Sequence, residues 1–176
     1  NEALGFQRGR DCWKPLLAAV HGYAVGGGLE LVLGCDIVLA ADNAQFGLPE
    51  VRRGLMADGA GIHRLVRRVP YSVAMGMVLT GQFIGAEEAH RVGLVNEVTS
   101  GEELRAATER WVAQIMECAP LSLRASKEAA LRGLELPLWE AVGQSFPMAE
   151  KLYASEDFIA GPEAFAEKRK PEWKGQ

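Results

Sequence analysis

The sequence is short of cysteine and aromatic residues, and it has no long apolar run. Its cysteines, Cys12, Cys35 and Cys118, are widely spaced and form no CxxC pair, which argues against a disulfide framework and against a zinc site. The longest apolar runs, such as 16–20 and 37–41, are too short to span a membrane, and no charged-then-apolar leader stands at the start. These shortages favour a cytoplasmic protein with no membrane as a partner.

A basic excess is also missing, because 19 Lys and Arg stand against 23 Asp and Glu for a net charge of -4. Nucleic-acid-binding domains usually carry a strong basic excess, so nucleic acid is not expected as a partner. The composition, 48% hydrophobic and 24% charged, is ordinary for a globular chain with a buried core. We expect one domain, with at most one appendage.

Short apolar segments punctuated by glycine dominate the first hundred residues. Residues 16–20 and 36–42 predict two short strands, and 27–34 between them predicts about two turns of helix. From Pro70 onward the pattern becomes helical. The predicted helices cover 70–81, 86–93, 102–120, 121–134 and 138–153. The sequence therefore predicts an α/β layer followed by a helical end-piece.

Three glycines, Gly26 to Gly28, open the first predicted helix. Glycine lets a ligand approach the backbone closely, and a helix start offers unpaired amides and roughly half a positive charge. Such a turn can hold an oxygen that becomes negative, as in an oxyanion hole. Phosphate binding is a competing use, but the Walker lysine and Ser/Thr are absent after these glycines and GxGxxG is not matched. From the loop alone, a tight packing turn is the other alternative.

Two acids follow the glycines. Glu30 has apolar neighbours, Leu29, Leu31 and Val32, which suggests a pocket wall, although a first-turn acid also suits the helix dipole. Residues 43–55 predict a further strand followed by a loop, and Glu50 lies on that loop, where a lone carboxylate is more often a surface residue. Two carboxylates that face one cleft could divide acid and base roles if their environments separate their pKa values.

The segment "KPLLAAVHGYAVGGGLELVLGCDIVLAADNAQFGLPEV" resembles the central signature of the enoyl-CoA hydratase/isomerase, or crotonase, family. "LTGQFIGAEEAHRVGLVNEV" matches the segment that follows it there, and "SEDFIAGPEAFAEKRKPEWKG" is similar to the carnitinyl-CoA dehydratase branch. The resemblance implies an α/β fold built as a spiral of ββα turns. Residues 1–100 would be the C-terminal portion of that spiral core, and 101–176 a helical trimerisation and CoA-capping region.

The resemblance also implies a site. Family members hold the thioester oxygen of an acyl-CoA between two backbone amides, and one of these corresponds to Gly27, beside Gly26. Hydratases of the family use two glutamates, which correspond to Glu30 and Glu50. The implied reaction is hydration of a 2-enoyl-CoA, or the reverse dehydration of a 3-hydroxyacyl-CoA, by a carbon–oxygen lyase. It implies no metal or redox cofactor, because coenzyme A is part of the substrate.

Asp58 departs from the common hydratase pattern, which has glycine at this position. Dienoyl-CoA isomerases and carnitinyl-CoA dehydratases resemble this chain there, so Asp58 is a candidate substrate-binding residue and an isomerase using Glu50 and Asp58 is an alternative function. Against the isomerase, that subfamily has aspartate where this chain has Glu30. A cap for a following helix is the alternative role of Asp58.

Other implications concern partners. Phe165 and Lys168 lie where family members lend an aromatic ring and a lysine to CoA bound in a neighbouring subunit of a homotrimer or dimer of trimers. A solvated charged tail is the alternative, as is a non-catalytic acyl-CoA binder for the whole chain. The arginines are expected on a solvated or subunit-facing surface, namely Arg52, Arg53, Arg64, Arg67 and Arg68. Family chains are longer at the N-terminus, so we expect that the early strands and the loop with the second oxyanion amide are absent from these 176 residues.

Overall fold

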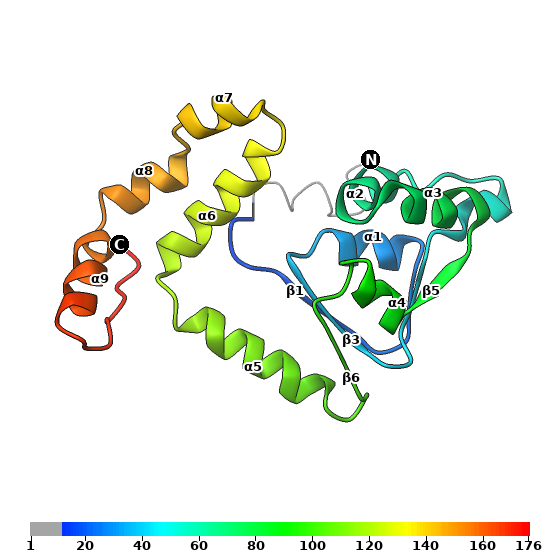
Figure 1. Cartoon of the computed structure of the whole chain (residues 1–176), viewed down its shortest axis with the longest axis horizontal. Helices are drawn as coiled ribbons and strands as arrows, with labels where there is room; N and C mark the ends of the chain where they lie inside the picture. The colour runs from blue at the N-terminus through cyan, green and yellow to red at the C-terminus, as the bar shows by residue number, and fades with distance from the viewer. Residues whose placement is uncertain (1–11) are drawn as a thin grey trace. The chain divides into compact units, whose positions relative to one another are not determined.

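The computed structural model describes residues 12–176, which fall into two compact units (Figure 1). The first unit comprises Leu16–Trp111, and the second comprises Val112–Gln176 with the described residues up to Pro15. The predicted functional division, into a portion of the spiral core and a trimerisation region, stays a prediction.

The strands of the first unit form two small sheets. One is parallel throughout, in the order β1-β3-β6, and pairs Leu17 with Ile37 and Leu39 with Glu97. The other has the order β2-β4-β5, with β2 parallel and β5 antiparallel to β4. The strands are β1 (Leu17–Val20), β2 (Tyr23–Val25), β3 (Ile37–Ala41), β4 (Gln45–Gly47), β5 (Phe83–Gly85) and β6 (Glu97–Thr99). The strands predicted over 16–20 and 36–42 are thus confirmed.

Helices cover these sheets. They are α1 (Gly27–Leu33), the 3-10 helix η3 (Pro49–Arg53), α2 (Gly61–Arg68), α3 (Tyr71–Thr80), α4 (Ala86–Arg91) and α5 (Leu104–Met116), which continues into the second unit. The predictions for α1, α3, α4 and α5 are confirmed, whereas α2 was not predicted. Helix α2 follows Ala60, which has a left-handed backbone and makes no side-chain cap. The sequence therefore lacks the usual polar signal for a helix start.

Strand β3 separates two apolar clusters. Val38 and Ala40 point into a core shared with α1 to α4, whose fully buried members include Leu29, Phe46 and Leu65. Leu39 and Ala41, which alternate with them, belong to a second cluster that holds α5. This alternation follows from the two-residue period of a strand. Full burial of one such large side chain stabilises the fold by about 1.5–3 kcal/mol.

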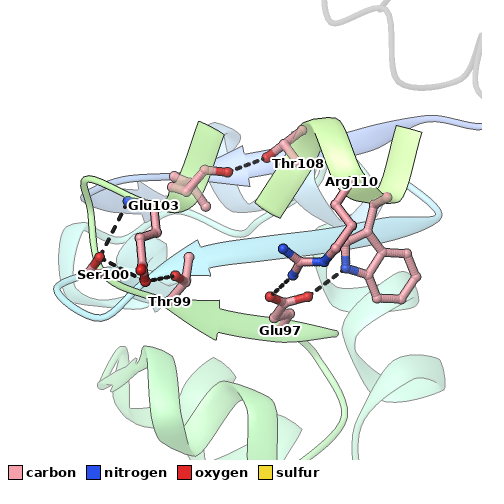
Figure 2. A network of polar contacts seen from close by, with 8 residues as sticks. Glu97, Thr99, Ser100, Glu103, Thr108 and Arg110 are labelled. Atoms are coloured by element: carbon pink, nitrogen blue, oxygen red, sulfur yellow. Dashed lines mark hydrogen bonds and ion pairs between the residues drawn. The ribbon is translucent and has the colours of Figure 1, made fainter. Parts of the chain in front are cut away.

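A polar network fastens the first half of α5 to β6 (Figure 2). The Glu97 carboxylate accepts a hydrogen bond from the Trp111 indole at 2.7 Å and another from Arg110. At the other end of this segment, Thr99 and Ser100 donate to Glu103. The bonds from Trp111 and then Arg110 hold the pKa of Glu97 below its ordinary value.

The second unit is helical. It contains α6 (Pro120–Gly133), α7 (Leu138–Gly143), α8 (Pro147–Tyr153) and α9 (Glu156–Ala166), with α6 packed against α8. The predicted helix at 121–134 is confirmed, but a single helix over 138–153 is wrong. Phe146 has an extended backbone before Pro147, as residues before proline prefer, so the helix is divided there. None of the described helices is long and apolar enough to cross a membrane.

Candidate active site

The glycine turn is fixed to the end of β4. Gly26 has φ 59° and ψ -127°, a conformation that is essentially restricted to glycine. Its amide donates to the Gly47 carbonyl at 2.9 Å, and its carbonyl accepts from the Glu30 amide at 3.0 Å. Gly27 and Gly28 are the first residues of α1, so their amides have no acceptor within the helix. An added Cβ at either would meet nothing within 4 Å, and the turn therefore borders open space.

Glu50 lies against this turn. It belongs to η3, and its Oε1 would be 3.0 Å from a Cβ on Gly26, so a side chain at position 26 would crowd the carboxylate. Its Oε2 is buried and has no hydrogen-bond partner among the described residues. A buried carboxylate oxygen without a partner lowers the free energy of unfolding, so this oxygen is a candidate for a functional role.

Glu30, in the first turn of α1, is buried, with 4% of its surface exposed. Its Oε1 accepts a hydrogen bond from the Gly61 amide, at the start of α2, at 2.9 Å. A Cβ on Gly59 would lie 2.3 Å from Oε2, and one on Gly61 would lie 2.8 Å from Oε1. Two residues that the sequence analysis did not single out thus form the pocket for this carboxylate. The signal that could have shown them is the Gly-Ala-Gly spacing at 59–61.

Gly26 thus links the two glutamates, one through a side chain and the other through its backbone. Glu50 lies against Gly26, and the Glu30 amide is bonded to the carbonyl of the same residue. An open pocket of about 400 Å³ adjoins the helix start; it is lined by residues 19–24 and Gly28, and not by either glutamate. Within the described residues, no group of three or more His, Cys, Asp and Glu could hold a metal ion. The arrangement offers carboxylates and helix-start amides, which suit proton transfer next to a stabilised oxyanion.

Asp58 lies on the loop that closes over Glu30, one residue before Gly59. Its side chain is exposed, and its amide donates to the Met56 carbonyl at 2.8 Å. The alternative role as a helix cap is wrong, because Ala60 occupies the cap position of α2 and no side chain caps it. A role for Asp58 in substrate binding stays a prediction.

The two residues predicted to contact CoA are in the second unit. Phe165, in the last turn of α9, is 86% exposed. Lys168 follows the helix with a positive φ of 56°, and its amide donates to the Phe165 carbonyl at 3.1 Å. The turn presents an aromatic ring and an ammonium close together in the chain, and the predicted CoA contact stays a prediction.

The expectation of a solvated arginine surface is wrong for two residues. The Arg68 guanidinium is partly buried and donates to the Cys35 carbonyl at 2.6 Å. Arg64 lies against Gly34, where an added Cβ would be 2.8 Å from its Nη1. The reason is that both side chains project from α2, which the sequence did not predict, towards the end of α1. Arg67, by contrast, is exposed.

Known proteins are similar to this chain in sequence and in fold. The sequence pattern of the enoyl-CoA hydratase/isomerase family matches residues 3–176. The (E)-benzylidenesuccinyl-CoA hydratase of Thauera aromatica is 44% identical over 163 residues, which cover 93% of this chain and 64% of that protein. The carnitinyl-CoA dehydratase of Escherichia coli (strain K12) is 45% identical over 167 residues, again covering 93% of this chain and 64% of that protein.

The same likeness holds in three dimensions. The crystal structure of an enoyl-CoA hydratase from Mycobacterium tuberculosis H37Rv matches with a TM-score of 0.89 at 38% identity, over 93% of this chain and 65% of that one. The chain thus spans less than two thirds of the length of the curated relatives it matches. The α/β crotonase-like fold implied by the sequence is confirmed, and the chain belongs to the enoyl-CoA hydratase/isomerase family.

Proposed function

We propose that the protein hydrates a 2-enoyl-CoA thioester or catalyses the reverse dehydration of a 3-hydroxyacyl-CoA. The observation that carries the proposal is the buried, unpaired Oε2 of Glu50, whose carboxylate lies against Gly26, at the start of the helix that carries Glu30. The names of the relatives, a hydratase and a dehydratase of CoA thioesters, support the reaction class.

The chemistry follows from where charge develops. Hydration adds a hydroxyl to the β-carbon and a proton to the α-carbon, and it passes through an enolate whose negative oxygen the Gly27 amide would stabilise. One glutamate would take a proton from the attacking water, and the other would deliver a proton to the α-carbon. The bond from Gly61 orients Glu30, whereas the free oxygen of Glu50 is available to water or substrate. This scheme uses no metal or redox cofactor.

A second candidate is a double-bond isomerase that uses Glu50 and Asp58. The observation in its favour is that the Asp58 side chain is exposed and does not cap α2. Incubation with a 3,5-dienoyl-CoA distinguishes the two, because an isomerase would shift the diene absorbance and a hydratase would not.

The proposal extends to assembly and location. Homotrimers or dimers of trimers would place Phe165 and Lys168 beside the CoA of a neighbouring subunit. In support, the second unit exposes large apolar side chains on and near α7, including Leu134 at 78% and Trp139 at 81%. Apolar patches of this kind commonly mark subunit contacts. A cytoplasmic location is part of the same proposal, since the cysteine usage favours a reducing compartment.

The test compares crotonyl-CoA hydration by the wild-type protein, Glu30→Gln and Glu50→Gln. Each substitution keeps the shape of the side chain but removes its charge, and we expect kcat to fall by about two to four orders of magnitude. Glu87→Gln, which changes an exposed glutamate of α4, is the matched control and should retain full activity. Normal rates in both site variants would refute the proposal. Acyl-CoA binding without turnover by the wild type would instead identify a non-catalytic binder.

A further inference from the structure

The C-terminal end of α1 is held by one side chain from α2. Backbone amides cap the carbonyls of residues 30–32. The Arg68 guanidinium binds the carbonyls that follow: Nη1 donates to Leu33, the last residue of α1, at 3.4 Å and to Cys35 at 2.6 Å, and Nη2 donates to Asp36 at 3.0 Å. Three backbone carbonyls at and just after the helix end, those of residues 33, 35 and 36, are therefore bonded to one side chain.

Arginine suits this place for two reasons. Its planar fork carries several donors in fixed directions, which a lysine ammonium cannot reproduce. Its positive charge also interacts favourably with the negative end of the helix dipole. Burial lowers the pKa of Arg68, the charge of Asp36 opposes that shift, and the group stays cationic at neutral pH.

Helix α2 therefore contacts α1 at both ends. At its start, the Gly61 amide donates to the Glu30 carboxylate at 2.9 Å, and at its end Arg68 donates to the last carbonyl of α1 and to two carbonyls just after it. Between these points, the absence of a side chain at Gly34 leaves room for Arg64. Helix α1 has only 7 residues, too few for a stable helix by itself, so its direction depends on such contacts.

We propose that Arg68 is a positioning residue, which sets the direction of α1 and so the place of the Gly27 amide and of Glu30 at its other end. This inference rests on the proposed function. A helix of this length is about 10 Å long, so a tilt of roughly 6° about its C-terminal end would move the first turn by about 1 Å. A misplacement of about 1 Å in a catalytic site can cost on the order of 100-fold in rate.

The experiment uses Arg68→Met, which keeps much of the apolar stem but removes every donor, and Arg68→Lys, which keeps the charge but not the fork. Arg67→Met is the matched control, because the exposed Arg67 donates within its own helix to the His63 carbonyl at 2.8 Å. With crotonyl-CoA, well below the unfolding temperature, we expect kcat of Arg68→Met to fall at least about 10-fold while KM changes less than about 2-fold. Arg68→Lys should lie between this variant and the wild type, and the control should match the wild type.

A merely structural role would lower the unfolding midpoint but leave kcat per folded molecule unchanged, and this result would overturn the inference. If Arg68→Met does not fold, Arg68→Lys decides in the same way. Hydrogen–deuterium exchange over 26–33 and 59–63 gives a readout that does not need turnover. Should the wild type turn over no enoyl-CoA, the proposed function fails, and exchange alone decides: faster exchange at 26–30 in the Arg68 variant than in Arg67→Met supports the inference, and equal exchange overturns it.

Discussion

Buried carboxylates occur in both units, but their oxygens are used differently. In the second unit, Asp157 is 3% exposed, and its two oxygens accept from the amides of Lys174 at 2.8 Å and Gly175 at 2.9 Å. Glu128 is 1% exposed; it accepts from the Met148 amide at 2.6 Å and pairs with Arg132 at 3.3 Å. Both acids have partners for each oxygen, so both connect separate segments of the helical unit.

In the first unit, the described residues give Glu30 a hydrogen bond at Oε1 and leave Glu50 Oε2 without one. Burial alone therefore does not identify a catalytic acid in this protein. The candidate site differs in having a carboxylate oxygen without a hydrogen-bond partner, Glu50 Oε2, near helix-start amides that border open space. The predictions below test this contrast.

Apart from the two glutamate substitutions, the largest effect is expected from Gly59→Ala. The new Cβ would lie 2.3 Å from Glu30 Oε2, so the loop or the carboxylate must move. A shift of about 1 Å should lower kcat roughly 100-fold, equivalent to about 2.7 kcal/mol. Steady-state hydration of crotonyl-CoA measures the loss.

Gly76→Ala in α3 is the control, because nothing lies within 4 Å of its Cβ position. It should raise the free energy of unfolding by about 0.5–1 kcal/mol and leave kcat unchanged. Equal activity in the two alanine variants would show that the glycine pocket around Glu30 does not matter.

In the second unit, Asp157→Asn should act on stability. The amide side chain keeps one acceptor but places a donor opposite a backbone donor, so one of the bonds to Lys174 and Gly175 is lost. We expect a loss of about 2 kcal/mol in the free energy of unfolding, measured by urea denaturation. Glu156→Gln, which affects an exposed pair with Lys174, should change little. A stable Asp157→Asn protein would remove the distinction between the two kinds of acid.

Glu97 is an intermediate case, since both of its oxygens have partners but its side chain is 30% exposed. Its pKa is lowered in the folded state, so its contribution to stability is present above the ordinary value of 4.5 and is lost as the pH falls through the lower folded value. Glu97→Gln should flatten the decline in unfolding free energy below pH 4.5 and have little effect on its shape above that pH. Thermal melts at several pH values measure the decline, and Glu109→Gln, which changes an exposed glutamate, is the control. A decline in Glu97→Gln identical to that of the wild type would contradict the prediction.

Local signals explain what the sequence could predict. The glycines at 26–28, the short apolar segments on either side and the spacing to Glu30 are all contained in one stretch of chain, and the structure has the predicted helix there. Apolar residues at steps of three or four, such as Leu104, Ala107 and Trp111, likewise predict α5, because a helix with one buried face repeats its pattern at this spacing.

The surroundings of Glu30 could not be predicted in the same way. They come from Gly59, just before α2, and from Gly61, the first residue of α2, a helix that lacks a polar cap and that meets α1 only after the chain folds. The division between α7 and α8 was not predicted for another reason. The helical pattern of 138–153 contains Pro147, and this proline begins a new helix. The alternative role of Asp58 as a helix cap is wrong for a similar reason, because the chain enters α2 through Ala60, which has a left-handed backbone.

The backbone at Gly26 limits how this protein can be re-engineered. A mutational library over the turn should recover glycine alone at position 26, where φ is 59° and a side chain would also crowd Glu50. Position 28, which has open space around it, should accept other small residues. Directed evolution towards new acyl groups therefore has more freedom at the residues that line the pocket, such as Gly28, than at Gly26.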